Sequence, residues 1–417
     1  MSNSLSKDVQ VIFENILPKF EENLVLSNLV KKKTVNQQDA ERSQNVMWET
    51  VPYIAQSYTG VDATANMKNL TELAVPSSIS EERHSTFRLT AQELNDLTQE
   101  DKAGEACAQT LASDINQSVA DVLTNQGSLV VARTTAAAGF DDVAECDTIL
   151  NQQGVVTGER VLALSSSDYN AMAGNLANRA NMVDKTNKAY TKGYVGEILG
   201  FDTYKQDFAR TIAAGTAGAV TVNGADQYYT PQALDSNNTL VDNRYQNLAV
   251  TVGANTLAVG DCLTIAGVYA VHHINKESTG GLKTFRITAI ISGAGGTGTI
   301  EISPPIISGG GNTTAELNYK NVDATPATGA AITLLNTTAA KANPFWIKDS
   351  VIITPGSYAM KSGRGVDVAS GTTENGIELT ITKALDDKTT KNDYILRVRY
   401  GVTMLNPEMA GILLFSQ

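Results

Sequence analysis

The first part of the chain carries apolar residues at steps of three and four positions, a spacing that places side chains on one face of a helix. The stripe consists of Val9, Ile12, Phe13, Ile16, Leu17, Phe20 and Leu24. It predicts a helical arm over residues 1–33. Pro18 lacks a backbone donor in the middle of this stretch, so we expect either a kink or two helices. The stripe must cover a surface, which belongs either to the same chain or to a neighbouring subunit.

A second and longer helix is predicted over residues 98–127. Thr98 can cap its start, Glu100 and Asp101 make an acidic first turn, and Gly127 can end it. A ridge of apolar or small side chains recurs every four residues, at Ala103, Cys107, Leu111, Ile115, Val119 and Leu123. Thirty residues of helix span about 40 Å. The small residues at the start of the ridge would let this helix lie close to a sheet.

Residues 34–82 have a different pattern, because they are polar and rich in Thr, Ser, Asn and Gln. Alternation in "VMWETVPYIAQSY" predicts a hairpin with a long tip near "TGVDATANMKN". A long polar hairpin has little apolar surface of its own to bury. We therefore expect it to be stable only where something else covers it.

The remaining chain divides into a mixed region and a β-rich region. Residues 128–210 alternate helix and strand signals, as in "DDVAECDTILNQQ" and "GERVLALSS", which indicates α/β structure. From about residue 213 to 340 the chain is rich in Thr, Val, Ile and Gly, with five or six alternating strands separated by turn residues. This pattern predicts a small antiparallel barrel or sandwich. Since a mixed pattern returns after "NPFWIKDS", the β region is predicted to be an insertion.

Composition narrows the class of protein. The chain has 417 residues, 42% of them hydrophobic and 18% charged, which is typical of globular domains with sizeable cores. Its three cysteines are too few and too far apart for a disulfide framework, and fit a reducing cytoplasm. We expect neither a signal peptide nor a membrane helix. The net charge of −12 argues against sequence-independent binding to phosphate backbones.

The stretch "GDCLTIAGVYAVHHINKES" holds two of the three histidines and one cysteine. Adjacent side chains of a strand point to opposite faces, so His272 and His273 cannot both face one metal ion unless the strand breaks there, and Cys262 lies ten residues before His272. This is not the ligand spacing of a zinc site. We predict ordinary barrel residues here, and no bound metal or cofactor.

Two glycine-rich stretches also have non-catalytic interpretations. "GAGGTG", residues 293–298, matches the dinucleotide-binding pattern, but the β-branched "TIEISPP" follows it instead of a helix, which predicts a hairpin turn. "SGGGN" at 308–312 is likewise predicted to be a turn. The nucleophile-elbow, P-loop and zinc-protease motifs are absent from the sequence, and three histidines leave few general bases. The sequence therefore predicts no enzyme.

Five short stretches, in their order along the chain, resemble one family. They are "GSLVVAR" after the long helix, "LDSNNTLVDNRYQNLAVTV", "GDCLTIAGVYAV", "ANPFWIKDSVIIT" and the closing "YGVTMLNPEMAGILL". Together with the arm, the hairpin and the inserted barrel, they are similar to the major coat proteins of tailed bacteriophages of the P22-like group. The resemblance implies an α+β fold of the HK97 type with an inserted antiparallel barrel.

The resemblance also implies a division of the chain into regions. These are an N-terminal arm (1–33), an extended hairpin or E-loop (34–85), the spine helix with part of the P-domain (86–160), part of the A-domain (161–212), the inserted barrel or I-domain (213–340), the A-domain return (341–390) and the closing P-domain strands (391–417).

A coat protein of this kind would be a shell subunit of an icosahedral head, found in the virion and assembled in the host cytoplasm. Its implied partners are copies of itself in hexamers and pentamers, a scaffolding protein, a portal protein and packaged double-stranded DNA bound without sequence preference, with no membrane. The shell would expand as DNA is packaged. Candidate contact residues between subunits are Asp235, Asp242, Arg244, Phe13, Phe20, Trp48, Tyr53 and Lys68.

Alternatives remain open at this stage. Asp242 and Arg244 could instead pair within their own turn. The chain could be another phage structural component, such as a tail-tube or decoration protein, although tube proteins are usually shorter and lack a long central helix. It could also be a shell subunit of the encapsulin kind, although those run shorter and lack the inserted barrel. A secreted glycan-binding or glycan-cleaving protein would need surface aromatic residues and paired carboxylates, which the predicted barrel lacks.

Overall fold

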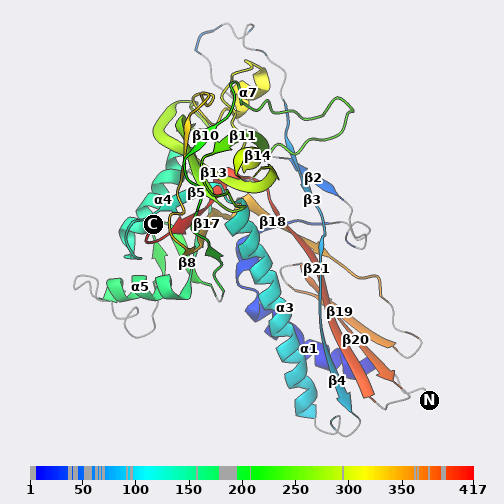
Figure 1. Ribbon diagram of the computed structural model, residues 1–417. Coiled ribbons are helices and arrows are strands. Elements are labelled where there is room, and N and C mark those ends of the chain that lie inside the picture. The colour runs from blue at the N-terminus through cyan, green and yellow to red at the C-terminus, as the bar shows by residue number, and fades with distance from the viewer. Residues whose placement is uncertain are drawn as a thin grey trace. The chain divides into compact units, whose positions relative to one another are not determined.

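The computed structural model in Figure 1 describes most of the chain, and its residues form two compact units. The described residues are 6–35, 40, 46–50, 59–61, 64, 67, 71–90, 93, 97–155, 158–177, 195–206, 208–293, 295–360, 363, 366–373, 376–386 and 391–417. Unit 1 comprises residues 1–47, 76–120 and 351–403, and unit 2 comprises 48–75, 121–350 and 404–417. Each unit is therefore assembled from three separate stretches of sequence.

Unit 1 contains a six-stranded sheet. Its strands are β1 (Lys31–Lys32), β18 (Val351–Gly356), β21 (Lys391–Met404), β20 (Glu378–Asp386) and β19 (Val366–Thr372) in that order, with β4 (Glu81–Thr90) also paired to β21. Alternate residues of β21 are fully buried, at Tyr394, Leu396, Val398 and Tyr400. This period of two means that one face of the sheet carries the core.

Two helices contribute to the core of unit 1. They are α1 (Ser6–Asn23) and the first four-fifths of α3 (Leu97–Gln126), which confirm the predicted arm helix and the predicted long helix. The helix α1 runs through Pro18 as one element, and not as two. Pro18 has no N–H group to donate to the carbonyl of Glu14, four residues earlier. Both residues lie on the exposed face of the helix, so water can donate to that carbonyl instead.

The apolar stripe of α1 is buried within unit 1. Ile12, Phe13, Ile16, Phe20 and Leu24 are each 6% exposed or less. Close approach to the neighbouring elements depends on two glycines. A Cβ atom at Gly371 of β19 would lie 2.5 Å from a ring carbon of Phe13, and one at Gly104 of α3 would overlap Ile16. The end of α1 is fixed by Asn116 of α3, which donates to the carbonyl of Asn23 and accepts from the amide of Leu26.

Unit 2 contains a mixed sheet and a barrel. The sheet has the order β5 (Leu129–Ala132), β22 (Ala410–Leu414), β17 (Asn343–Ile347), β6 (Arg160–Leu164), β8 (Phe201–Lys205) and β7 (Glu197–Ile198). The pairs β5–β22 and β6–β8 are parallel. Helices α4 (Phe140–Gln152) and α5 (Ser166–Ala177) supply Val143, Leu150 and Met172 to the core that covers this sheet.

The barrel is closed and antiparallel, as predicted from the alternating strands. Its order is β10 (Val220–Val222), β11 (Gln246–Val252), β14 (Gly296–Ser303), β13 (Ser278–Ser292), β12 (Cys262–Val271) and β15 (Ala331–Leu334). Just outside it, β9 (Thr211–Ile212) pairs with β16 (Ala340–Lys341). This pairing brings the two ends of the segment together, which explains how a barrel can be inserted into the chain. The short helix α7 (Thr314–Tyr319) lies between β14 and β15 in the sequence.

Two strands correspond to the predicted hairpin. β2 (Met47–Thr50) and β3 (Ala74–Ser77) form a two-stranded sheet, while most of the predicted tip at 59–69 falls outside the described residues. Gly293 and Gly295 lie between the paired antiparallel strands β13 and β14, and Gly296 begins β14, which confirms the predicted hairpin turn. Among the described helices, none combines the length and hydropathy needed to cross a membrane.

Candidate functional site

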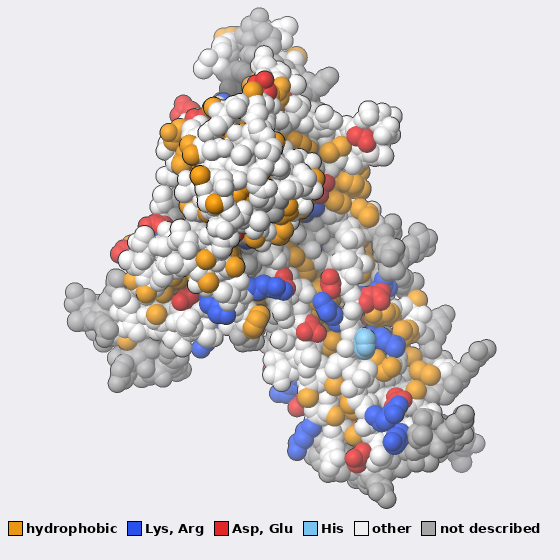
Figure 2. All heavy atoms as spheres, in the orientation of Figure 1, with side chains coloured by type: hydrophobic (Ala, Val, Ile, Leu, Met, Phe, Trp, Pro, Cys, Tyr) orange, Lys and Arg blue, Asp and Glu red, His pale blue; other side chains and the backbone are white. Residues whose placement is uncertain are grey.

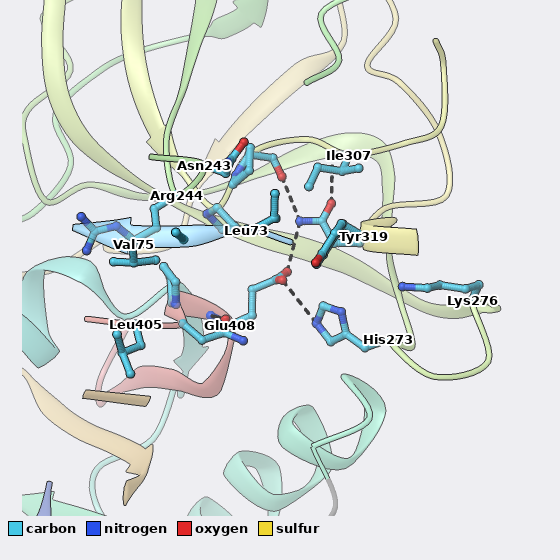
Figure 3. A pocket seen from close by; sticks show the side chains of 16 residues that line it. Leu73, Val75, Asn243, Arg244, His273, Lys276, Ile307, Tyr319, Leu405 and Glu408 are labelled. Atoms are coloured by element: carbon cyan, nitrogen blue, oxygen red, sulfur yellow. Dashed lines mark hydrogen bonds and ion pairs between the residues drawn. The ribbon is translucent and has the colours of Figure 1, made fainter. Parts of the chain in front are cut away.

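The C-terminal segment brings one largely buried carboxylate to the barrel. Asn406 caps the short helix η5 (Pro407–Met409) by accepting a hydrogen bond from the amide of Glu408. The side chain of Glu408 then reaches Lys283 of β13, His273 and Asn321. Figure 3 shows the contact between Glu408 and His273. His273 Nε2 lies 3.3 Å from one carboxylate oxygen, and Asn321 Nδ2 donates to the other at 3.2 Å.

Lys283 and His273 also join this cluster to the end of α4. The ammonium group of Lys283 is completely buried and donates to Gln153 Oε1 at 2.8 Å as well as to Glu408. The amide of His273 donates to the carbonyl of Gln153 at 3.1 Å. One cluster therefore joins the barrel, the end of α4 and the segment leading into β22.

The electrostatics of the cluster follow from burial and from one close cation. Burial lowers the pKa of His273 to about 4, against the opposing pull of Glu408, so the imidazole is neutral at pH 7. Burial would raise the pKa of Glu408, but the charge of Lys283 holds it at about 2. The cluster is thus an ion pair with a neutral histidine beside it. The charged groups of Lys283 and Glu408 pair with each other, an arrangement that suits a structural link within the subunit.

A cavity of about 90 Å³ opens next to this cluster. Figure 3 shows its wall, which includes Leu73 and Val75 from the end of the predicted hairpin, Ile307 and Leu405. Lys276 also lines it, and burial lowers the pKa of its ammonium group to about 8. The ammonium donates to the carbonyl of Lys320 at 3.2 Å. The lining is mainly apolar and its cations have partners.

Asp242 and Arg244, both candidate contact residues, lie together in the turn before β11. Arg244 donates from Nε and Nη2 to the carboxylate of Asp242, the latter at 2.6 Å, and from Nη1 to the carbonyl of Met404 at 2.8 Å. Its guanidinium also lies 5.1 Å from the ring centre of Tyr245. The side chain of Arg244 is 11% exposed. The intramolecular pairing left open by the sequence is therefore present.

Asp235 occupies the turn of a small hairpin whose Leu234 and Leu240 form a bridge. Its carboxylate accepts hydrogen bonds from the amides of Thr239 and Asn237, which lower its pKa. Leu234 and Leu240 are 47% and 40% exposed. Sequence reasoning missed this exposed apolar pair. The stretch "LDSNNTL" could have indicated it, since two leucines flank a polar turn.

The other candidate contact residues lie elsewhere. Phe13 and Phe20 are buried within unit 1 of the same chain, and Trp48 is half-buried on β2. Tyr53 and Lys68 fall outside the described residues. Among the described members of this set, Asp242 and Arg244 form an ion pair with each other.

The two histidines and the cysteine of the stretch 260–278 do not form one site. Nδ1 of His272 accepts hydrogen bonds from the amides of Ile274 and Asn275 within its own turn, and His273 faces Glu408. Cys262 is fully buried, and burial raises the pKa of its thiol. Within the described residues, no three His, Cys, Asp or Glu side chains converge in a way that could hold a metal ion.

Comparison with known families decides the identity of the fold. The sequence profile described as "P22 coat protein - gene protein 5" matches residues 1–416. This chain belongs to the P22 coat protein family. As a coat protein it is a major capsid protein of a bacteriophage, and copies of it build the icosahedral shell of the virion. The match covers almost the whole chain, so it decides for the coat protein over the tail-tube, decoration, encapsulin-like and glycan-binding alternatives.

Several solved structures are similar to this coat protein. One from Mycobacterium phage Che8 is 11% identical, with a TM-score of 0.43 and coverage of 94% of this chain and 90% of that chain. The capsid of cyanophage P-SCSP1u is 10% identical, with a TM-score of 0.45 and coverage of 94% and 88%. The CUS-3 coat protein I-domain is 44% identical over 29% of this chain and 99% of its own length, with a TM-score of 0.24.

The elements that the sequence resemblance implies for an HK97-like coat protein occur in this chain. They are the N-terminal helix, the base of a hairpin, the long helix, the mixed sheet with its helices and the inserted barrel. The α+β fold class is confirmed.

Proposed function

We propose that this coat protein assembles in the host cytoplasm around a scaffolding protein and closes a shell with a portal protein at one vertex. The shell then expands as double-stranded DNA is packaged. The observation that supports this proposal is the family match over residues 1–416. The assembly partners themselves are an expectation drawn from the resemblance of the sequence to P22-like coat proteins.

We propose that packaged DNA meets this protein without sequence-specific binding. The chain carries a net charge of −12. On the face seen in Figure 2, Lys and Arg side chains are interspersed with Asp and Glu side chains, and do not gather into one basic patch. Mixed charge of this kind gives little electrostatic attraction for a phosphate backbone, so DNA could move past the surface during packaging.

We also propose that the role of this protein is structural and not enzymatic. The strongest candidate for chemistry is the Lys283–Glu408–His273 cluster, and its groups are occupied with one another. His273 is neutral at pH 7, and its Nε2 lies 3.3 Å from the carboxylate of Glu408, which itself pairs with Lys283.

We propose that contacts between subunits use two segments of the chain. One is the hairpin built on β2 and β3, which carries Trp48 and, outside the described residues, Tyr53 and Lys68. The other is the small hairpin 234–240, where Leu234 and Leu240 expose apolar surface beside Asp235. Exposed apolar pairs are favoured at protein interfaces.

Expression of the full chain with and without its neighbouring genes tests the assembly proposal. Electron microscopy should show uniform closed particles when a scaffolding gene is present, and fewer or irregular particles when it is absent. Particles of identical size, shape and yield in both cases would rule out the scaffolding partner. The shell-forming role would survive that result.

A further inference from the structure

The returning strand of the hairpin lies against the inserted barrel within unit 2. The hydroxyl group of Tyr319, the last residue of α7, donates to the carbonyl of Thr71 at 2.8 Å. Three residues later, Ala74 forms a parallel β-bridge with Asp242. Leu73 and Val75 are 6% and 2% exposed and line the cavity seen in Figure 3. Residues 71–75 are therefore held by hydrogen bonds and by apolar burial.

The barrel side of this contact is itself fixed. Arg244 holds the carboxylate of Asp242 through Nε and Nη2, and it donates from Nη1 to the carbonyl of Met404. The amide of Arg244 also donates to Asp242 at 3.2 Å. Hydrogen bonds that involve an ionised group are stronger than neutral ones. Asp242 is thus a rigid partner for the strand that carries Ala74.

The hairpin needs such support. Within the described residues, β2 and β3 contain four residues each and form a two-stranded sheet, to which the bridge between Ala74 and Asp242 adds the one contact with the barrel backbone. An isolated pair of strands is at best marginally stable in water. The grouping of residues 48–75 with the barrel in one compact unit agrees with support from this side.

We propose that the inserted barrel clamps the base of the hairpin, with Tyr319, Asp242 and Arg244 as the positioning residues. The clamp fixes where residues 71–75, which lead into β3, lie on the barrel. An effect of the clamp on shell assembly depends on the role proposed above for the hairpin in contacts between subunits. The clamp itself is a property of the single subunit.

A different explanation is that burial of Leu73 and Val75 alone holds the strand, and that the polar contacts are incidental. The two explanations predict different results when the hydroxyl group of Tyr319 is removed. Tyr319→Phe keeps the ring and its packing but removes the donor to Thr71, while Arg244→Gln releases the carboxylate of Asp242. Tyr269→Phe is a matched control, because Tyr269 lies on barrel strand β12 and is 38% exposed.

Amide hydrogen exchange on the full-length, unassembled chain tests the clamp. We expect exchange at residues 71–77 to become about five- to tenfold faster in Tyr319→Phe and at least as fast in Arg244→Gln, because each loses a hydrogen bond that resists local opening. Strands β13 and β14 should keep their protection. Tyr269→Phe should match the parent chain throughout.

Unchanged exchange at 71–77 in both variants would overturn the clamp, as would a loss of protection spread over the whole barrel in Tyr319→Phe. Electron microscopy of the same variants separates the two proposals. If residues 71–77 are loosened but normal shells still form, the clamp stands and the proposed role of the hairpin fails.

Discussion

Lys283 and Glu408, 125 positions apart in the sequence, form an ion pair in which the lysine side chain is fully buried and the glutamate side chain is 12% exposed. Removing one partner of such a pair leaves an unpaired charge in the interior. Lys283→Met should therefore lower the free energy of unfolding by about 3–5 kcal/mol. In the double variant Lys283→Met/Glu408→Gln most of this loss should be recovered, since no buried charge remains.

Urea denaturation of the full chain measures this effect. Lys348→Met is a suitable control, because Lys348 pairs with Glu159 at the surface, and such pairs contribute about 0–1 kcal/mol. If Lys283→Met and Lys348→Met shift the urea midpoint equally, the cluster around Glu408 does not make the expected contribution to the free energy of unfolding.

His273 should give the protein a specific sensitivity to acid. Burial lowers its pKa in the folded state to about 4, below the ordinary value of about 6.5. Between these two values the unfolded chain binds more protons than the folded chain, so stability falls as the pH falls from about 6.5 to 4. Glu408, with a folded pKa of about 2 against an ordinary value of about 4.3, adds a further loss below pH 4.3.

Urea midpoints measured from pH 7 to pH 4.5 test this prediction. His273→Gln should flatten the decline in this range, whereas His84→Gln, on the exposed side of β4, should leave it unchanged. An unaltered decline in His273→Gln would show that other groups cause the acid sensitivity.

The sequence could predict the types of these residues but not their partners. The alternation of side chains along a strand did not decide the fate of the two histidines, because β12 ends at Val271 and both lie in the turn that follows, each with its own partner. The sequence could not pair His273 with Glu408, since nothing local links residues so far apart. For Asp242 and Arg244 the spacing allowed an intramolecular pair, and the structure shows that pair.

At the scale of elements, the docking of α1 depends on the absence of a side chain at Gly371. A Cβ atom there would lie 2.5 Å from the buried ring of Phe13. Gly371→Ala should therefore destabilise unit 1 by about 1–3 kcal/mol, the usual cost of overpacking. It should also make residues 6–23 more sensitive to limited proteolysis.

Gly174 provides the control for this substitution. It lies in α5, and an added Cβ would meet no atom within 4 Å. Gly174→Ala should be neutral or stabilising by up to about 1 kcal/mol, because alanine favours helices over glycine. Equal stability of Gly371→Ala and the parent chain would contradict the close packing of α1 on β19.

The pattern of apolar residues predicted several elements well. The long helix, the arm helix and the strands of the barrel all show clear periods of 3.6 or 2, which local sequence encodes directly. The pattern did not reveal that the stretch after Ser350 leaves the unit of β17 and joins the sheet of β4 and β21. The strand before Ser350, β17, and the strand after it, β18, are similarly apolar. Only long-range packing decides which sheet each of them joins.

At the scale of the whole molecule, shell formation requires contact surface that is exposed on the single subunit, and the apolar side chains of Leu234 and Leu240 provide such surface. Leu234→Asp/Leu240→Asp places two charges on the exposed hairpin, away from any core cluster. We expect the variant to fold normally but to reduce the yield of closed particles at least about tenfold, because desolvating charges at many identical contacts is costly.

Sucrose-gradient sedimentation gives the particle yield, and thermal unfolding verifies the fold. Val259→Asp tests whether any exposed apolar residue would act alike, since Val259 is 62% exposed elsewhere on the barrel. Normal particle yield from Leu234→Asp/Leu240→Asp would exclude this hairpin as a contact.

The central claim is that copies of this chain assemble into a closed icosahedral container. The most direct measurement is electron microscopy with image reconstruction of particles formed by the full-length protein. The account predicts closed particles with icosahedral symmetry, built from this chain. A chain that sediments only as a monomer under all assembly conditions, or that forms only open tubes, would contradict it.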